Sequence, residues 1–402
     1  MFRYLFLTWP GAGNQVPATG LACELVAQGH EVVFAGYEVQ RERFEQLGLG
    51  FRTLEGAQRD WPRAQPDNWM RALVGTVWAS EKHLTDVPEA LAASYDVLVV
   101  DCLMFGALAA AERLGVPTVV LVHSAPGALV PPGGAVEAPM LGAVNAVRVA
   151  AGRTPASRLW DAWLPFLTLC TSVPELDPLA AEVPAEFRYV GPIAEPAPPS
   201  GWRPPWSETD PRPLVVASFS TGVAWDQTSR IQRTLDALDD GQHRLLVTTG
   251  LMDTTALSVP GDAALVPFVP HAEVLPSAAV VVTHAGHGTV AAALAHGLPV
   301  VCLPNEAADQ PALAHQIART GAGIALDGER ATPAQIKDAV TAVRRRDGYV
   351  ASAGKLGEAI TTAPGVTAAV SMLEQAASQG RRRRVDPNQV ETPGRDPGLL
   401  DR

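Results

Sequence analysis

The sequence predicts an α/β protein made of two doubly wound, Rossmann-like domains that face each other across a cleft. Short apolar runs alternate with segments of helical periodicity, which is the pattern of βαβ units. The alternation stops in a proline-dense stretch and then starts again. A chain of 402 residues is long enough for two cores, because single domains cluster at about 100–200 residues. Two such sheets present the C-terminal ends of their strands to a shared cleft.

The first domain is predicted over residues 1–192. Its strands are expected at 3–8, 31–35, 96–100 and 117–122. Between the first two strands, apolar residues recur at helical spacing, with Pro17 near the start of the helix and Gly29 near its end. A further helix and a loop with a weak helix are expected at 103–114 and 126–150. Residues 55–90 contain prolines and three tryptophans, and we expect them to be irregular.

Residues 193–213 hold prolines too densely for a helix or a central strand, and we interpret them as an interdomain linker. The second domain is predicted over residues 214–380. Its strands are expected at 214–219, 243–248, 263–266, 280–283 and 299–303, and its helices near 227–238, 287–297, 309–320, 333–346, 352–361 and 366–378. The tail at 381–402 is charged, dotted with prolines and almost free of aromatic residues, so we expect it to be disordered.

The composition excludes several classes of protein. A net charge of -11 argues against nucleic acid as the main partner, since phosphate binding needs clustered cations. No run approaches the about 18 apolar residues of a membrane-spanning helix, and the first apolar run is too short for a secretion signal. The four cysteines are widely spaced and lack zinc-binding spacing. We therefore expect a cytoplasmic protein with reduced thiols.

A glycine-rich turn at residues 284–289 follows the strand at 280–283 and opens a helix. Unpaired amides and the positive end of the helix dipole meet at such a turn, and its glycines let an anion approach the main chain. His284 and the Thr289 hydroxyl could donate to phosphate oxygens. Asp309 and Gln310, after the next strand, offer groups of the kind that hold sugar hydroxyls. The plain alternative is an ordinary strand-to-helix turn, since short glycine patterns are common.

The segments HAGHGT at 284–289, GLPVVCLP at 297–304 and DQ at 309–310 together resemble the donor-binding signature of Leloir glycosyltransferases of the GT-B fold. The likeness is closest to the bacterial branch that decorates natural products, such as macrolides and other antibiotics. It implies an inverting transfer from a UDP- or TDP-sugar, with the nucleotide sugar as co-substrate and with neither a cofactor nor a metal. The donor residues that it implies are Ser220, Thr221, Gly222, Phe268, Val269, His284, Gly286, His287, Gly288, Thr289, Asp309 and Gln310.

Within that set, the resemblance gives each group a role. His284 and the amides near Gly288 and Thr289 hold the diphosphate, and Asp309 and Gln310 hold the sugar. Phe268, where the family usually has Trp, lies with Val269 beside the nucleobase, and residues 220–222 form a second phosphate-side loop. His287 could approach the diphosphate or point into solvent.

The general base departs from the family pattern. The first turn of the resembling family reads Gly-His-x-x-Pro with the histidine as base, whereas this chain has Asn14 at that position. An asparagine side chain has no titratable proton near neutral pH. The family's companion aspartate corresponds to Asp101. We predict His123, directly after the strand at 117–122, as the base, with Asp101 and Asn14 shaping its surroundings, because an unperturbed histidine pKa of about 6.5 suits proton abstraction.

Several alternatives to this base stay open. His123 could be an ordinary hydrogen-bonded residue at a strand end. Asp101 could take the proton itself or through a water molecule. The acceptor could need no strong base, as with an acidic phenol, an amine or a nucleophilic carbon. The protein could also have no catalytic activity at all.

The three tryptophans at 61, 69 and 78 are candidates for an apolar acceptor wall, since aromatic faces suit hydrophobic aglycones and sugar rings. Packing of Trp61, Trp69 and Trp78 onto their own sheet is the alternative. The expected partners are therefore a nucleotide sugar and an apolar small molecule, with the chain as a monomer or homodimer. Competing functions are a sugar-nucleotide epimerase or hydrolase of the same fold and a non-catalytic helper protein.

Overall fold

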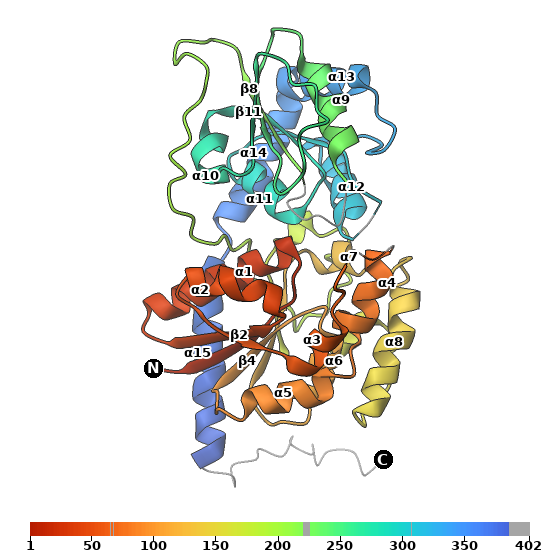
Figure 1. Cartoon of the computed structure of the whole chain (residues 1–402), viewed down its shortest axis with the longest axis vertical. Coiled ribbons are helices and arrows are strands. Elements are labelled where there is room, and N and C mark those ends of the chain that lie inside the picture. Colours follow the sequence, from red (N-terminus) through yellow and green to blue (C-terminus); the bar gives the residue numbers. More distant parts are fainter. Residues whose placement is uncertain (65, 67, 220–225, 307, 386–402) are drawn as a thin grey trace, which may run out of the picture.

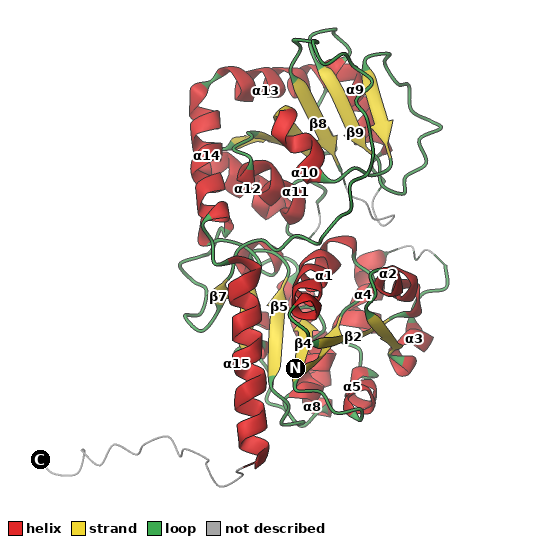
Figure 2. Cartoon of the chain, turned by 90° about the vertical axis from the view of Figure 1, so that its left-hand side faces the viewer, coloured by secondary structure: helices red, strands yellow, loops and turns green. Residues whose placement is uncertain are grey.

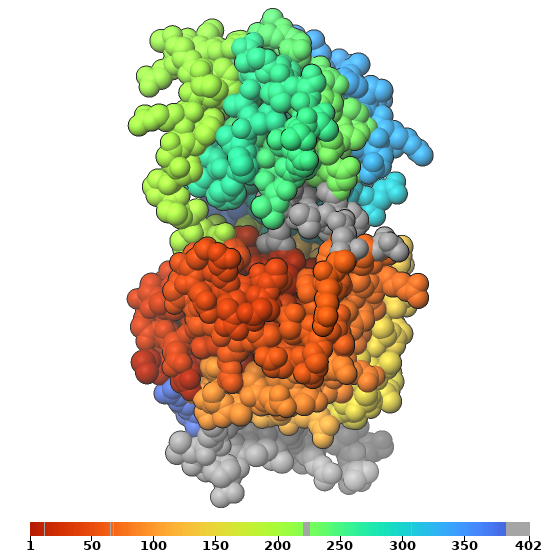
Figure 3. All heavy atoms as spheres, viewed as in Figure 1, coloured from red at the N-terminus to blue at the C-terminus, as the bar shows by residue number. Residues whose placement is uncertain are grey.

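The computed structural model describes residues 1–64, 66, 68–219, 226–306 and 308–385. The chain forms two lobes stacked along the long axis, each a parallel sheet with helices on both faces (Figure 1). In the space-filling view the lobes are separate masses that meet at a waist (Figure 3). The predicted α/β class with two doubly wound sheets is confirmed.

The first sheet has seven strands in the order β3-β2-β1-β4-β5-β6-β7, all parallel. They are β1 (Arg3–Leu7), β2 (Glu31–Gly36), β3 (Gly50–Thr53), β4 (Val97–Asp101), β5 (Thr118–Val122), β6 (Leu167–Cys170) and β7 (Arg188–Tyr189). The strand order reverses between β1 and β4, and ligands of open α/β sheets bind at such a point. The turns after β1 and β4 therefore lie where a site is expected.

The helices of this lobe are α1 (Ala12–Ala27), α2 (Arg41–Gln46), α3 (Glu55–Asp60), α4 (Trp69–Leu73), α5 (His83–Leu91), α6 (Phe105–Ala111), α7 (Pro126–Leu129) and α8 (Glu137–Ala150), with the short turns η1 (Glu38–Gln40), η2 (Val74–Trp78), η3 (Leu159–Ala162) and η4 (Pro174–Leu176). Three expectations are wrong here. Residues 55–90 are largely helical, Pro17 lies inside α1, and β3, β6 and β7 are strands that were not expected. These strands have four residues or fewer, too short for a clear periodic signal.

The second sheet has six parallel strands in the order β10-β9-β8-β11-β12-β13. They are β8 (Leu214–Ser218), β9 (Arg244–Thr248), β10 (Ala263–Val266), β11 (Ala278–Thr283), β12 (Val300–Cys302) and β13 (Gly323–Ala325). Its helices are α9 (Thr228–Leu238), α10 (His271–Val274), η5 (Leu275–Ser277), α11 (His287–Ala295), α12 (Gln310–Thr320), α13 (Pro333–Arg345) and α14 (Asp347–Thr361). The order reverses between β8 and β11, which places the glycine-rich turn at the second switch point.

The last helix, α15 (Gly365–Val385), returns to the first lobe and runs beside its sheet (Figures 1 and 2). Its Val370 and Leu373 join the core formed by Leu21 and Leu25 of α1, and Arg381 pairs with Asp96 at 2.6 Å.

The predicted limit of the second domain at residue 380 groups this helix with the second sheet, although its side chains pack on the first. The expected disorder from residue 381 is wrong for 381–385, which continue α15. The remainder of the tail lies outside the described residues. Among the helices of the described chain, none is both long and apolar enough to cross a membrane.

Candidate active site

Asp101 and His123 are neighbours at the C-terminal edge of the first sheet. Asp101 ends β4 and is paired in register with Leu121 of β5, and His123 directly follows β5. Both strands are fully buried, as expected for a parallel sheet covered on two faces. The sheet therefore fixes the backbone positions of Asp101 and His123 next to each other.

The side chains of Asp101 and His123 form a dyad. His123 Nδ1 lies 2.9 Å from Asp101 Oδ2. The other carboxylate oxygen, Oδ1, accepts hydrogen bonds from the Trp9 indole at 2.9 Å and from the Leu103 amide at 3.0 Å. With Nδ1–H directed at the carboxylate, the neutral ring keeps Nε2 as the proton acceptor. The His123 side chain is 11% exposed.

The surroundings of His123 favour its protonated form. Burial alone would lower the pKa of His123, but the Asp101 carboxylate offsets burial and raises the pKa well above its usual value. Cys102 Sγ lies 3.6 Å from the same ring nitrogen. Burial raises the pKa of the Cys102 thiol, so this group stays neutral near pH 7. The charge that raises the pKa of His123 is therefore that of Asp101.

Asn14 lies in the same cluster and is buried. Its amide nitrogen donates to Thr8 Oγ1 at 3.2 Å, to the Trp9 carbonyl at 3.1 Å and to Asp101 Oδ2 at 3.4 Å. Its Oδ1 has no hydrogen-bond partner within the described ranges. In this position Asn14 braces the turn after β1 and the Asp101 carboxylate.

One set of potential metal ligands occurs among the residues that the structure describes. Asp101, Cys102 and His123 present ligand atoms that all lie within 4.8 Å of one another. Thiolate, imidazole and carboxylate are groups that zinc accepts. A cation held through His123 Nδ1 and Asp101 Oδ2 would replace the hydrogen bond that joins these two atoms in the dyad.

The glycine-rich turn of the second lobe joins β11 to α11. Its N-cap, Gly286, has no capping side chain, so it leaves first-turn amides of α11 available to a ligand. A Cβ at Gly286 would lie 2.5 Å from His284 Nε2, so a side chain at this position would displace the His284 ring. Ala285 adopts a left-handed conformation with φ 67°, which is strained for a residue with a side chain.

Burial lowers the pKa of His284 to about 4. The ring is therefore neutral near pH 7 and can donate a hydrogen bond from one nitrogen. A neutral donor beside the positive end of α11 is suited to a phosphate oxygen.

His287 contacts the first lobe. Its Nε2 and Ser172 Oγ lie 2.9 Å apart, and burial lowers its pKa to about 4. The solvent-facing alternative for His287 is wrong, because the side chain is buried. Its hydrogen-bond partner is Ser172 of the opposite lobe.

Asp309 contacts the residue that follows His123 in the first lobe, whereas Gln310 is hydrogen-bonded within its own lobe. Ser124, the residue after His123, donates from Oγ to Asp309 Oδ2 at 2.6 Å. Gln310 Oε1 accepts from the backbone and side-chain nitrogens of Asn305 at 3.0 and 2.8 Å. Ala125 and Ala128 pack on Leu313 between α7 and α12, which holds the two loops together.

The remaining predicted donor residues differ in exposure. Phe268 is 62% exposed, whereas Val269 beside it is buried. Gly288 is exposed and Thr289 half-buried at the start of α11. Ser220, Thr221 and Gly222 lie outside the described residues.

Solved structures with the same architecture cover nearly all of the chain. The glycotransferase of kitacinnamycin has a TM-score of 0.76 at 20% sequence identity and covers 93% of this chain and 98% of its own. The calicheamicin glycosyltransferase CalG4 has a TM-score of 0.73 at 20% identity, over 94% and 99%. The fold is therefore that of these two-lobed proteins.

Sequence relatives decide the class. A family model described as "Erythromycin biosynthesis protein CIII-like, C-terminal domain" matches residues 232–376, and a "Glycosyl transferase 4-like domain" model matches residues 12–167. The 4'-demethylrebeccamycin synthase of Lentzea aerocolonigenes is 28% identical over 420 aligned residues, 92% of this chain and 99% of that protein. This chain is a GT-B glycosyltransferase. The predicted kinship with bacterial natural-product glycosyltransferases is confirmed.

The tryptophans of the predicted acceptor wall divide into two groups in this glycosyltransferase. Trp61 and Trp69 are half-buried, with ring centroids 6.0 Å apart, and Tyr37 lies 4.8 Å from Trp61. Trp78 is 4% exposed and packs edge-on against Trp9 at 6.2 Å. Trp78 therefore supports the indole that binds Asp101, while Trp61 and Trp69 form an aromatic pair nearer the surface.

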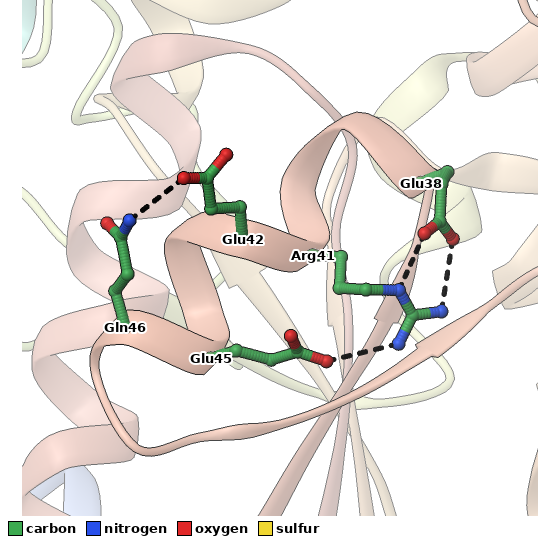
Figure 4. Close-up of a pocket in the computed structure, with 5 residues that line it drawn as sticks. All are labelled: Glu38, Arg41, Glu42, Glu45 and Gln46. Atoms are coloured by element: carbon green, nitrogen blue, oxygen red, sulfur yellow. Dashed lines mark hydrogen bonds and ion pairs between the residues drawn. The ribbon is translucent and has the colours of Figure 1, made fainter.

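Two surface hollows lie away from these groups. One is on η1 and α2, where Glu38, Arg41 and Glu45 form ion pairs (Figure 4), and it is lined by Glu38, Arg41, Glu42, Glu45 and Gln46. The other extends past Arg41 to Arg52 and Asp86. Neither contains a predicted site residue of the glycosyltransferase. Polar contacts, rather than hollow size, identify its candidate site.

Sequence reasoning missed several contributors to the site. Trp9 and Cys102 contact the dyad, and Ser124 and Ser172 bind across the lobes. Ser124 and Cys102 are adjacent in sequence to predicted residues, which is a signal that could have identified them. Trp9 and Ser172 make contacts that no local sequence pattern predicts.

Proposed function

We propose that this glycosyltransferase moves a sugar from a UDP or TDP donor to an apolar natural product with inversion, and that His123 is the base. One observation carries the proposal: the His123–Asp101 dyad is next to Ser124, whose hydroxyl binds Asp309. A base and a candidate sugar-binding carboxylate are thus joined across the lobes. The TDP-type donor is supported by the likeness to glycosyltransferase VinC, whose structure is a complex with DTDP (TM-score 0.67, 20% identity).

The transfer would proceed in one displacement. The acceptor hydroxyl gives its proton to His123 Nε2 while its oxygen attacks the anomeric carbon of the sugar. The bond from that carbon to the diphosphate breaks, and the electron pair leaves with the nucleoside diphosphate. Asp101 stabilises the resulting imidazolium. The amides at the start of α11 and neutral His284 would stabilise the charge on the leaving diphosphate without a metal or cofactor.

Asp101 is less suited to be the base itself. Its Oδ1 accepts from Trp9 and Leu103, and its Oδ2 from His123 and Asn14. These four donors occupy the lone pairs of the carboxylate, so a hydroxyl proton finds no free oxygen position on Asp101. His123 keeps Nε2 for this role.

A non-catalytic helper is the second candidate, and Asn14 is the observation that favours it. The intact dyad favours the enzyme instead, because a helper would need no imidazole bonded to a buried carboxylate. A sugar-nucleotide epimerase or hydrolase would need no aromatic pair such as Trp61 and Trp69, which we propose as part of the acceptor wall.

The experiment combines a panel of UDP- and TDP-sugars with a panel of apolar aglycones that includes phenols, alcohols and amines. Released nucleotide and product mass are both measured. The proposal expects nucleotide release that depends on the aglycone and a product heavier by one sugar. Release without an aglycone indicates a hydrolase, a changed sugar nucleotide an epimerase, and binding without turnover a helper. Each of these three results contradicts the proposal.

A further inference from the structure

A buried arginine lies behind the loop that carries Asp309 and Gln310. Arg230 of α9 is buried, and its Nη2 donates to the Pro304 carbonyl at 3.3 Å and to Glu329. Its Nη1 lies 3.4 Å from Gln227 Oε1 and 3.5 Å from the Asp226 carbonyl. Its Nε has no partner among the described residues. Burying a cation costs free energy that its contacts must offset, so its presence here calls for a role.

A continuous polar chain leads from Arg230 to Gln310. Gln227 Nε2 donates to Asn305 Oδ1 at 3.4 Å. Asn305 in turn donates from two nitrogens to Gln310 Oε1 at 3.0 and 2.8 Å. Gln227, Asn305 and Gln310 are all buried, so water competes little for these contacts.

This series of hydrogen bonds sets the orientation of the Gln310 amide. Because Asn305 occupies Oε1 with two donors, the amide group must direct its NH₂ away from Asn305. That NH₂ is the end of Gln310 that can donate to a ligand. The orientation holds only while the loop from Pro304 to Asn305 stays in place, and Arg230 binds both the Pro304 carbonyl and the Gln227 side chain that reaches Asn305.

We propose that Arg230 is a positioning residue for donor-sugar recognition: it fixes Pro304 and Asn305 so that the Gln310 NH₂ donates to a sugar hydroxyl oxygen. The inference rests on the proposed function, in which Gln310 and Asp309 bind the sugar. Arg230 acts through Gln227 and Asn305, and the diphosphate is held separately by the α11 turn. The loss of Arg230 therefore weakens recognition of the sugar, and it acts on the diphosphate site only through the charge that Arg230 exerts on His284.

The test compares Arg230→Met with Arg233→Met in the full chain. Arg233 is on the same helix but binds the carbonyls of Gly328 and Glu329, so it is the matched control. Two quantities are measured: the Kd of the free nucleoside diphosphate, and kcat/KM for a nucleotide sugar and for its analogues that lack one hydroxyl each.

For Arg230→Met we expect kcat/KM to fall about 10- to 100-fold, the loss typical of a misplaced binding group. The Kd of the free diphosphate should stay within about twofold of the wild-type value. One deoxy analogue that wild-type enzyme disfavours should be disfavoured less by the variant. Arg230→Lys should retain part of the activity that Arg230→Met loses, since a lysine can still bind the Pro304 carbonyl. Arg233→Met should behave like wild type.

Three results overturn the inference: unchanged kinetics in Arg230→Met, an equal loss of free diphosphate binding, or unchanged discrimination among the analogues. If Arg230→Met does not fold, as judged by its thermal unfolding, Gln227→Leu interrupts the same chain and must show the same loss of discrimination. A double-mutant cycle with Gln310→Ala must be non-additive, because both changes remove one contact. Wild-type protein that turns over no nucleotide sugar would instead refute the proposed function.

Discussion

Two histidines at the ends of parallel strands, His123 with an 11% exposed side chain and His284 buried, have different electrostatic surroundings. His123, in the first lobe, lies 2.9 Å from a buried carboxylate, and its pKa is raised well above the usual value although burial opposes this. His284, in the second lobe, makes no hydrogen bond to a carboxylate of the described residues, and burial outweighs the charge of Asp309 and lowers the pKa of His284 to about 4. The difference teaches that Asp101 makes one imidazole a proton acceptor, while burial makes the other a neutral hydrogen-bond donor.

The starts of α1 and α11, the helices at the two switch points, also differ. In the second lobe the turn before α11 contains His284, and no side chain caps the start of α11. In the first lobe Asn14 lies in the first turn of α1, where its amide donates to Asp101 and cannot take a proton. The imidazole that contacts Asp101 comes instead from the end of the neighbouring strand β5. Asp101 thus receives its imidazole partner from the end of β5 and not from α1.

The largest expected effect separates the two histidines by kinetics. His123→Ala should lower kcat by roughly 10²–10⁴-fold, because it removes the base. The Kd of the nucleoside diphosphate should be almost unchanged, since His123 lies outside the α11 turn. Steady-state rates and calorimetry measure the two quantities. Unchanged turnover would remove His123 from the mechanism.

A substitution of the other histidine, His284, tests how the leaving diphosphate is stabilised. His284→Ala should lower kcat by roughly 10²–10³-fold, the loss typical when one donor to a developing negative charge is removed. It should also weaken binding of the free diphosphate. A variant that binds the diphosphate as tightly as wild type would show that the α11 turn alone holds it.

Not all of this comparison could be predicted from the sequence. The apolar runs of β4 and β5 predict that Asp101 and His123 lie at one sheet edge, and the glycine pattern predicts the α11 turn. The contact of Trp9 with Asp101 and that of Ser172 with His287 join segments far apart in sequence, so no local periodicity encodes them. The short strands β3 and β7 owe their pairing to neighbours, and α15 is a predictable helix whose docking on the first sheet is not predictable.

A smaller effect concerns stability. His83 is fully buried, its ring nitrogens have no partner in the described chain, and burial lowers its pKa to about 4. Because the folded state resists protonation, its contribution to stability is full above pH 6.5 and is lost as the pH falls towards 4. Its share is about 1.4 kcal/mol per pH unit in that window.

Urea unfolding at pH 7 and pH 5 measures this contribution. His83→Leu breaks no hydrogen bond with the described residues, so this variant should lose less stability on acidification than wild type does. His284 and His287 contribute in the same direction and remain in the variant. Equal losses in the two proteins would contradict the assignment to His83.

The smallest expected effect is that of metal removal. Treatment with EDTA should leave kcat and KM unchanged, because the proposed chemistry relies on the α11 turn and on the hydrogen-bonded dyad, and neither needs a metal ion. Added zinc should inhibit, since it would compete for His123 and Asp101. A loss of activity in EDTA that Mg²⁺ or Mn²⁺ restores would mean that a metal, rather than the turn alone, stabilises the leaving diphosphate.

The pH profile of kcat/KM in wild type and in Asp101→Asn tests the central claim most directly. The base must be neutral to accept a proton, so activity in wild type should rise with pH through a limb that lies above 6.5, as the raised pKa of His123 requires. Without the carboxylate charge this pKa falls, and the limb in Asp101→Asn should move to lower pH while the maximal rate decreases. A limb at the same pH in both proteins, or none in wild type, would contradict the account.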